Sequence, residues 1–118
     1  GEKENDGIVI KKNEMVVISG NKKGVKILSI VKDITDKKIQ MTYEEYDKNA
    51  NTGKEMLTHN ADETGVIIQG DIELTVGQEK YNLKKGDGFY FDSRLPHKFK
   101  NIGSRKAIMV SANTPPSF

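Results

Sequence analysis

Two histidines and one glutamate offer the main chemistry of this sequence. The 118 residues contain two histidines, His59 and His97, and no cysteine. Because there is no thiolate, a metal ion would have to be bound by imidazole, carboxylate or backbone oxygen. His59 and Glu63 have the same parity, so in an extended segment both side chains point to one side. His97 comes 38 residues after His59, enough for a return strand whose antiparallel pairing would bring it opposite them.

Two imidazoles and one carboxylate are a sufficient set of protein ligands for Zn, Fe, Ni or Mn, and they leave open coordination positions. We therefore predict that His59, Glu63 and His97 bind a divalent metal ion. A structural interpretation stands beside this one, in which His97 is a core histidine next to Pro96 and Glu63 lies at the surface. In that case the chain is a metal-free binding module.

Short apolar runs separated by turn residues must position these side chains. The runs are rich in β-branched and aromatic residues, which is typical of strands. About ten strands at this spacing favour an antiparallel sandwich or barrel. The expected strands are Ile8–Ile10, Met15–Ile18, Val25–Val31, Lys38–Tyr46, Gly65–Gln69, Asp71–Val76, Lys80–Leu83, Phe89–Asp92, His97–Asn101 and Lys106–Ser111.

Alternation within two of these strands predicts which side chains face the interior. In the first, Met41 and Tyr43 share a face, and we expect both in the core or the pocket wall. In the second, His97 and Phe99 share a face. At the pocket mouth Arg94 would meet an anionic ligand, unless it is an ordinary solvated surface arginine. The set expected to line a ligand pocket is Met41, Tyr43, Phe91, Arg94, Phe99 and Met109.

The composition argues against several classes of protein. Nineteen Lys and Arg stand against 17 Asp and Glu, a net charge of +2 with the signs interspersed, so charge does not indicate a nucleic-acid-binding face. No apolar run approaches about 18 residues, so we expect no membrane span. The first fifteen residues are charged and lack an apolar core, which argues against a signal peptide and favours the cytoplasm. The length predicts a single domain over residues 1–118.

Between residues 57 and 101 the sequence resembles the cupin family, which is defined by two short motifs. The resemblance implies an all-β fold, a small antiparallel jelly-roll β-barrel of about ten short strands. Six positions match the second His, the Glu and the closing Gly of the first motif, and the opening Gly, the His and the Asn of the second: His59, Glu63, Gly70, Gly86, His97 and Asn101.

The chain departs from the family pattern at two places. Leu57 stands where the first His of the first motif belongs, and residues 92–94 (Asp-Ser-Arg) replace the Pro-x-Gly of the second. The metal site that the family implies therefore has three candidate ligands here instead of four: His59, Glu63 and His97.

From His59 to Phe118 the chain is similar to one subgroup, the C-terminal cupin domains of helix-turn-helix XRE-type transcriptional regulators, among them putrescine-utilisation repressors. The most subgroup-specific element is the ending Thr114-Pro115-Pro116-Ser117-Phe118. The resemblance implies a domain excised from a longer regulator, a small-molecule effector bound inside the barrel, and a homodimer. It also implies that DNA is contacted only through a helix-turn-helix domain absent from this chain.

A different class of function fits the same three ligands. His59, Glu63 and His97 resemble a facial triad with open sites for oxygen and substrate. The resemblance therefore extends to metal-dependent cupin enzymes of the oxygenase, epoxidase or isomerase type. The sensing domain is the expected function, with the enzyme and the metal-free binding module as alternatives.

Overall fold

The structure is a computed structural model that describes residues 7–19, 23–52 and 58–116. Within these ranges it contains nine strands and one turn of 3-10 helix at Lys12–Glu14. No helix in the described ranges is both long and apolar enough to cross a membrane. The strands are β1 (Val16–Val17), β2 (Val25–Ser29), β3 (Gln40–Tyr46), β4 (Asp62–Gln69), β5 (Asp71–Val76), β6 (Glu79–Lys84), β7 (Gly88–Asp92), β8 (His97–Asn101) and β9 (Ala107–Thr114).

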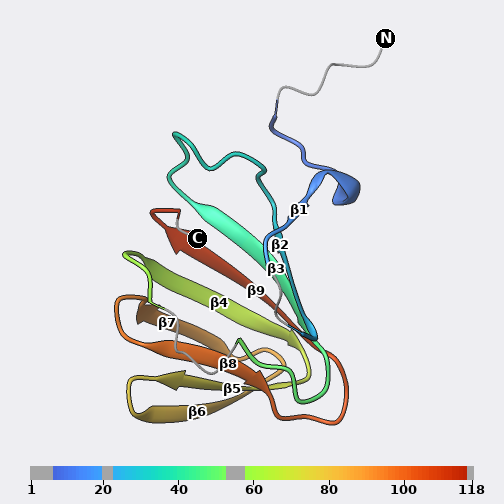
Figure 1. Ribbon diagram of the computed structural model, residues 1–118, viewed down its shortest axis with the longest axis vertical. Helices are drawn as coiled ribbons and strands as arrows, with labels where there is room; N and C mark the ends of the chain where they lie inside the picture. The colour runs from blue at the N-terminus through green and yellow to red at the C-terminus, as the bar shows by residue number, and fades with distance from the viewer. Residues whose placement is uncertain (1–6, 20–22, 53–57, 117–118) are drawn as a thin grey trace.

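The strands form two antiparallel sheets, as expected for a jelly-roll barrel. The larger sheet has six strands in the order β1-β2-β3-β9-β4-β7, and the smaller has three in the order β6-β5-β8. Figure 1 shows the smaller sheet below the larger one, with β4 leading from one into the other through the turn at Gly70. Gly70 has a φ of 83°, a left-handed conformation that glycine adopts without strain.

The first expected strand, Ile8–Ile10, is not formed. These residues lie outside any strand, and Ile8 and Val9 are 76% and 55% exposed. The run Met15–Ile18 contributes only the two-residue edge strand β1. In the other direction, β4 begins earlier than expected, at Asp62, and this places Glu63 inside a strand.

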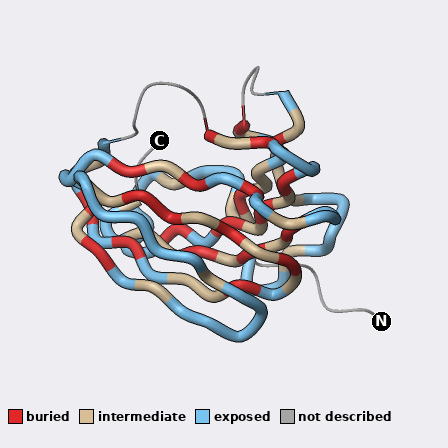
Figure 2. Tube along the Cα trace, turned by 90° about the horizontal axis from the view of Figure 1, so that it is seen from below, coloured by how far each residue is buried: buried red, intermediate tan, exposed pale blue. Residues whose placement is uncertain are grey.

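The core lies between the two sheets, and its apolar part is the part next to the smaller sheet. Its buried members come from both sheets, and they are Val25, Tyr46, Ala50, Ile67, Ile72, Leu74, Phe91, Phe99, Ala107 and Met109. Figure 2 shows buried positions recurring among exposed ones along the central strands, the alternation expected of sheets with one face inward.

Strand β3 turns the opposite face inward from the one that its apolar residues predict. The apolar alternation predicts Met41 and Tyr43 inside, but Met41 is 46% exposed and Tyr43 lies on the same, outer face. The buried face of β3 is polar instead, and its members are Gln40, Thr42, Glu44 and Tyr46. The alternation was correctly predicted, and the direction it faces was wrong.

Asn101 closes the end of β8 with its side chain. It is fully buried, and its Nδ2 donates hydrogen bonds to the carbonyl oxygens of Tyr46 (2.9 Å) and Arg105 (2.8 Å). Its Oδ1 accepts from the backbone N–H of Gly103 at 2.8 Å. The motif asparagine is therefore a structural residue that ties β8 to the chain after β3.

Candidate metal and ligand site

The three predicted ligands come from distant parts of the chain, and the structure places His97 between them, near Glu63 on one side and near the ring of His59 on the other. Glu63 lies on β4, His97 begins β8, and His59 precedes β4 with its backbone N–H donating to the carbonyl of Ser93 at 2.8 Å. The His97 Nε2 lies 3.8 Å from the Glu63 Oε1. The ring centroids of His59 and His97 are 5.5 Å apart.

The hydrogen bonds of His97 fix which ring nitrogen is free to bind a ligand. Its Nδ1 lies 2.8 Å from the carbonyl oxygen of Leu95, and since that oxygen only accepts, Nδ1 carries a proton. Desolvation by burial, followed by the charge of His59, holds the pKa of His97 below its ordinary value. In the neutral ring Nε2 then presents a lone pair, and this buried atom has no hydrogen-bond partner. Orientation of a histidine by a carbonyl is the arrangement found behind metal ligands.

Glu63 is a buried carboxyl group with an unusual acidity. It is 6% exposed, and its Oε2 accepts a hydrogen bond from the Ser111 hydroxyl at 2.8 Å. Burial, and then the nearby charge of Glu44, raise the pKa of Glu63 from an ordinary 4.5 to about 7, against the opposing effect of Ser111. An acid in this state exchanges its proton for a metal ion near neutral pH.

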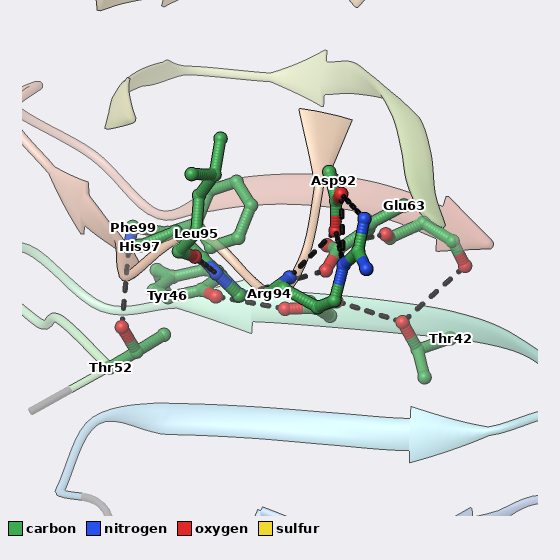
Figure 3. Close-up of polar contacts among 11 residues, drawn as sticks. Thr42, Tyr46, Thr52, Glu63, Asp92, Arg94, Leu95, His97 and Phe99 are labelled. Atoms are coloured by element: carbon green, nitrogen blue, oxygen red, sulfur yellow. Dashed lines mark hydrogen bonds and ion pairs between the residues drawn. The ribbon is translucent and has the colours of Figure 1, made fainter. Parts of the chain in front are cut away.

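A second buried acid, Glu44, lies beside Glu63 and was missed from the sequence. It is 6% exposed on β3 and accepts hydrogen bonds from the Thr42 hydroxyl and the Tyr46 hydroxyl, both at 2.8 Å. Burial and the charge of Glu44 raise the pKa of Tyr46 well above its ordinary value. Figure 3 shows Thr42, Tyr46, Glu63 and His97 gathered in this region. The available signal was that Glu44 shares parity with Tyr46, on the polar face of an alternating strand.

The donor types fit a divalent metal ion, but the donor atoms do not lie close enough together to form a metal site in this structure. In the described part of the chain, no group of three or more His, Asp or Glu stands close enough to hold a metal as it is. The fit rests on the buried, unpartnered Nε2 of His97 facing a carboxylate oxygen of Glu63. His97, Glu63 and His59 are the residues that would hold the ion. Leu57, which occupies the fourth ligand position, lies outside the described residues.

The remaining predicted pocket residues divide into buried and exposed ones. Phe91, Phe99 and Met109 are buried, and the Phe91 ring packs 4.7 Å from that of His97 between centroids. Arg94 does not reach the interior: its side chain is 71% exposed and pairs with Asp92 at 2.6 Å (Figure 3). Hydrogen bonds from Arg94 lower the pKa of Asp92 to about 2. Arg94 is thus a solvated surface arginine, the alternative that stood beside its expected place at the pocket mouth.

An apolar groove of about 330 Å³ runs along β5, β6 and β7. Phe91 lines this groove and also packs on the ring of His97. One aromatic side chain therefore contacts both the groove and the candidate metal ligands. The other lining residues are Leu74, Val76, Tyr81, Leu83, Gly88, Phe89 and Tyr90.

Comparison with known families agrees with this geometry. Residues 42–113, which include Glu44, Glu63 and His97, match the family described as "Cupin domain". The chain is a cupin. The fold is similar to that of a solved structure, KdgF from Halomonas sp., which aligns with a TM-score of 0.74 at 17% identity, over 94% of this chain and 96% of that one.

Among curated proteins, this cupin is similar to a transcriptional regulator. It is 26% identical over 111 residues to the HTH-type transcriptional regulator PuuR of Escherichia coli (strain K12), which covers 94% of this chain and 58% of PuuR. The chain thus spans a little over half the length of that relative. The Cupin_2 domain of an XRE family transcriptional regulator from Enterobacter cloacae aligns with a TM-score of 0.68 at 24% identity, over 80% of this chain and 99% of that one.

Proposed function

We propose that this cupin is the sensing domain of a transcriptional regulator, and that it binds a small-molecule effector inside the barrel with the help of a divalent metal ion. The single observation that carries the proposal is the similarity to PuuR, a regulator by name, along 94% of the chain. In this proposal the domain works as a homodimer. DNA would be contacted by a separate helix-turn-helix domain of the full-length protein.

His59, Glu63 and His97 would hold the metal ion, which when bound supplies a positive centre with open positions for an effector oxygen or nitrogen. The chain's own part in binding is to prepare the donors. The Leu95 carbonyl holds the proton on Nδ1 of His97, and the Ser111 hydroxyl orients Glu63. No described lysine or arginine is buried, so protein cations do not compete for these acids.

Phe91 provides a contact through which effector binding in the groove would change the position of the candidate metal ligand His97. It lines the apolar groove and packs on His97. An effector that displaced Phe91 would also move the ring of His97, which packs against it. The contact between Phe91 and His97 would then have two arrangements, and the effector would stabilise one of them. Coupling of this kind is what a sensing domain needs.

Metal analysis of protein purified without chelator tests the first half of the proposal. We expect near-stoichiometric divalent metal in the wild type and its loss in His97→Ala and in Glu63→Gln. Glu45→Gln is the matched control, since Glu45 neighbours Glu44 in sequence but lies on the outer face of β3. Metal content that stays substoichiometric and unchanged by His97→Ala would contradict the metal site and favour the metal-free binding module.

Effector binding is tested separately by thermal shift against a panel of small amines, carboxylates and sugars, with and without divalent metal. An effector should stabilise the wild type by mass action and do so less in Phe91→Leu. In the full-length protein the same compound should change the affinity for operator DNA.

The two-histidine, one-carboxylate donor set favours a second candidate, a metal-dependent enzyme. Oxygen consumption by the Fe(II)-loaded protein in the presence of a panel compound would identify it. Binding of that compound without turnover would leave the sensing domain as the better proposal.

A further inference from the structure

The outer face of the six-stranded sheet carries a continuous apolar row. The strand registers place five apolar side chains directly opposite one another across five neighbouring strands. In strand order β1-β2-β3-β9-β4 the row is Val17, Leu28, Tyr43, Val110 and Val66. A second row beside it contains Met41, Ala112 and Tyr90.

These rows are open in the single chain. Val17, Met41 and Tyr90 are 60%, 46% and 68% exposed. The solvated face of an antiparallel sheet is ordinarily polar, yet on β3 Met41 and Tyr43 share the outward face with Glu45. Contiguous apolar surface of this kind marks an interaction site more often than a solvated face.

We propose that this outer face is the surface through which two copies of the chain pair. The six strands contain 35 residues, which at about 3.3 Å per residue and about 4.8 Å between strands cover roughly 550 Å² per copy. Two such faces bury about 1,100 Å² in total, just above the roughly 1,000 Å² that a specific interface needs. A twofold interface of this kind uses the same patch on both copies. This inference rests on the homodimer included in the proposed function.

Two further features support a second copy as the occupant. A groove of about 700 Å³ continues the face at its β1 edge, where Val17 and Leu28 meet Lys11, Lys12 and Lys26. The rim carries both signs of charge close together, because Lys26 lies opposite Glu45 in register and Lys106 contacts Glu45 at 3.5 Å. A polar rim around an apolar centre is the usual anatomy of an interface. Because this rim carries both signs of charge, positive residues of one copy can face negative residues of the other.

The test compares Met41→Lys with Tyr81→Lys. The two residues are almost equally exposed, 46% and 49%, but Tyr81 lies on the smaller sheet. In sedimentation equilibrium the wild type and Tyr81→Lys should behave as a species of twice 13.2 kDa. Met41→Lys, and Val110→Lys at the centre of the row, should raise the dimer dissociation constant by about tenfold or more, since each buries an unpaired charge at the interface.

Circular dichroism spectra show whether each variant is folded, and Met41→Lys, being half exposed, should keep the spectrum of the wild type. A wild type that is monomeric at every concentration would overturn both the homodimer and its surface. A dimer that survives Met41→Lys and Val110→Lys would overturn the surface alone, and a dimer dissociated by Tyr81→Lys would move it to the apolar groove.

Because the chain contains no cysteine, single-cysteine variants give an independent readout. A short bismaleimide should cross-link Met41→Cys into a covalent dimer and leave Tyr81→Cys monomeric. Equal cross-linking of the two variants would overturn the assignment.

Discussion

Replacing the buried acid Glu63 by glutamine should change the pH dependence of stability in a defined direction. Burial and Glu44 raise the pKa of Glu63 from 4.5 to about 7 in the folded chain. Between these two values the folded state binds a proton that the unfolded state has lost. The free energy of unfolding therefore falls as pH rises through this window and levels off above it.

The size of the effect follows from the difference between 4.5 and about 7. At about 1.4 kcal/mol per pKa unit, Glu63 costs the metal-free wild type about 3 kcal/mol by about pH 8. Glu63→Gln removes this cost. The variant should therefore gain about 3 kcal/mol relative to the wild type between about pH 4.5 and about pH 8, with most of the gain complete by about pH 7.

Urea unfolding of both proteins in the presence of a chelator measures this difference. His97 is present in both proteins, and its lowered pKa acts in the opposite sense, because it costs stability as pH falls below its ordinary value of 6.5. Ser111→Ala provides a second check, because losing its hydrogen bond should move the Glu63 transition to higher pH. A difference that varies by less than about 1 kcal/mol across this range would refute the buried, uncompensated state of Glu63.

Four other changes have clear expected outcomes. Adding Zn²⁺ or Mn²⁺ at about pH 8 should raise the melting temperature of the wild type but not of His97→Ala, and Leu57→His should tighten binding if that position supplies a fourth ligand. Gly65→Ala should destabilise the chain by about 3 kcal/mol in urea unfolding, because its Cβ would lie 2.4 Å from the Val110 carbonyl oxygen. Asn101→Ala should cost about 3 kcal/mol or more, since it leaves several buried backbone groups unpaired; a cost below about 1 kcal/mol would contradict that role.

The sequence was sufficient to predict the fold class, because the alternation and the turn residues that define the strands are local patterns. It did not predict how His97 approaches Glu63: β8 pairs with β5 and not with β4, so the two side chains face each other from different sheets. It was not sufficient to predict which way β3 faces. Alternation gives two faces but no direction, and the usual rule, apolar side inward, selected Met41 instead of Glu44.

The reversal of β3 is best understood as a consequence of two demands on one sheet. Its inner face holds two buried acids beside a neutral histidine, with no buried lysine or arginine among the described residues to offset them. Burying an uncompensated carboxylate costs several kcal/mol, so folding alone gives no reason for this arrangement, whereas binding a cation in the interior does. The apolar residues of the same strand are left facing outward, where only contact with another surface removes them from water. The polar interior and the apolar exterior of β3 are therefore explained together if the chain binds a cation inside and pairs with a second copy outside.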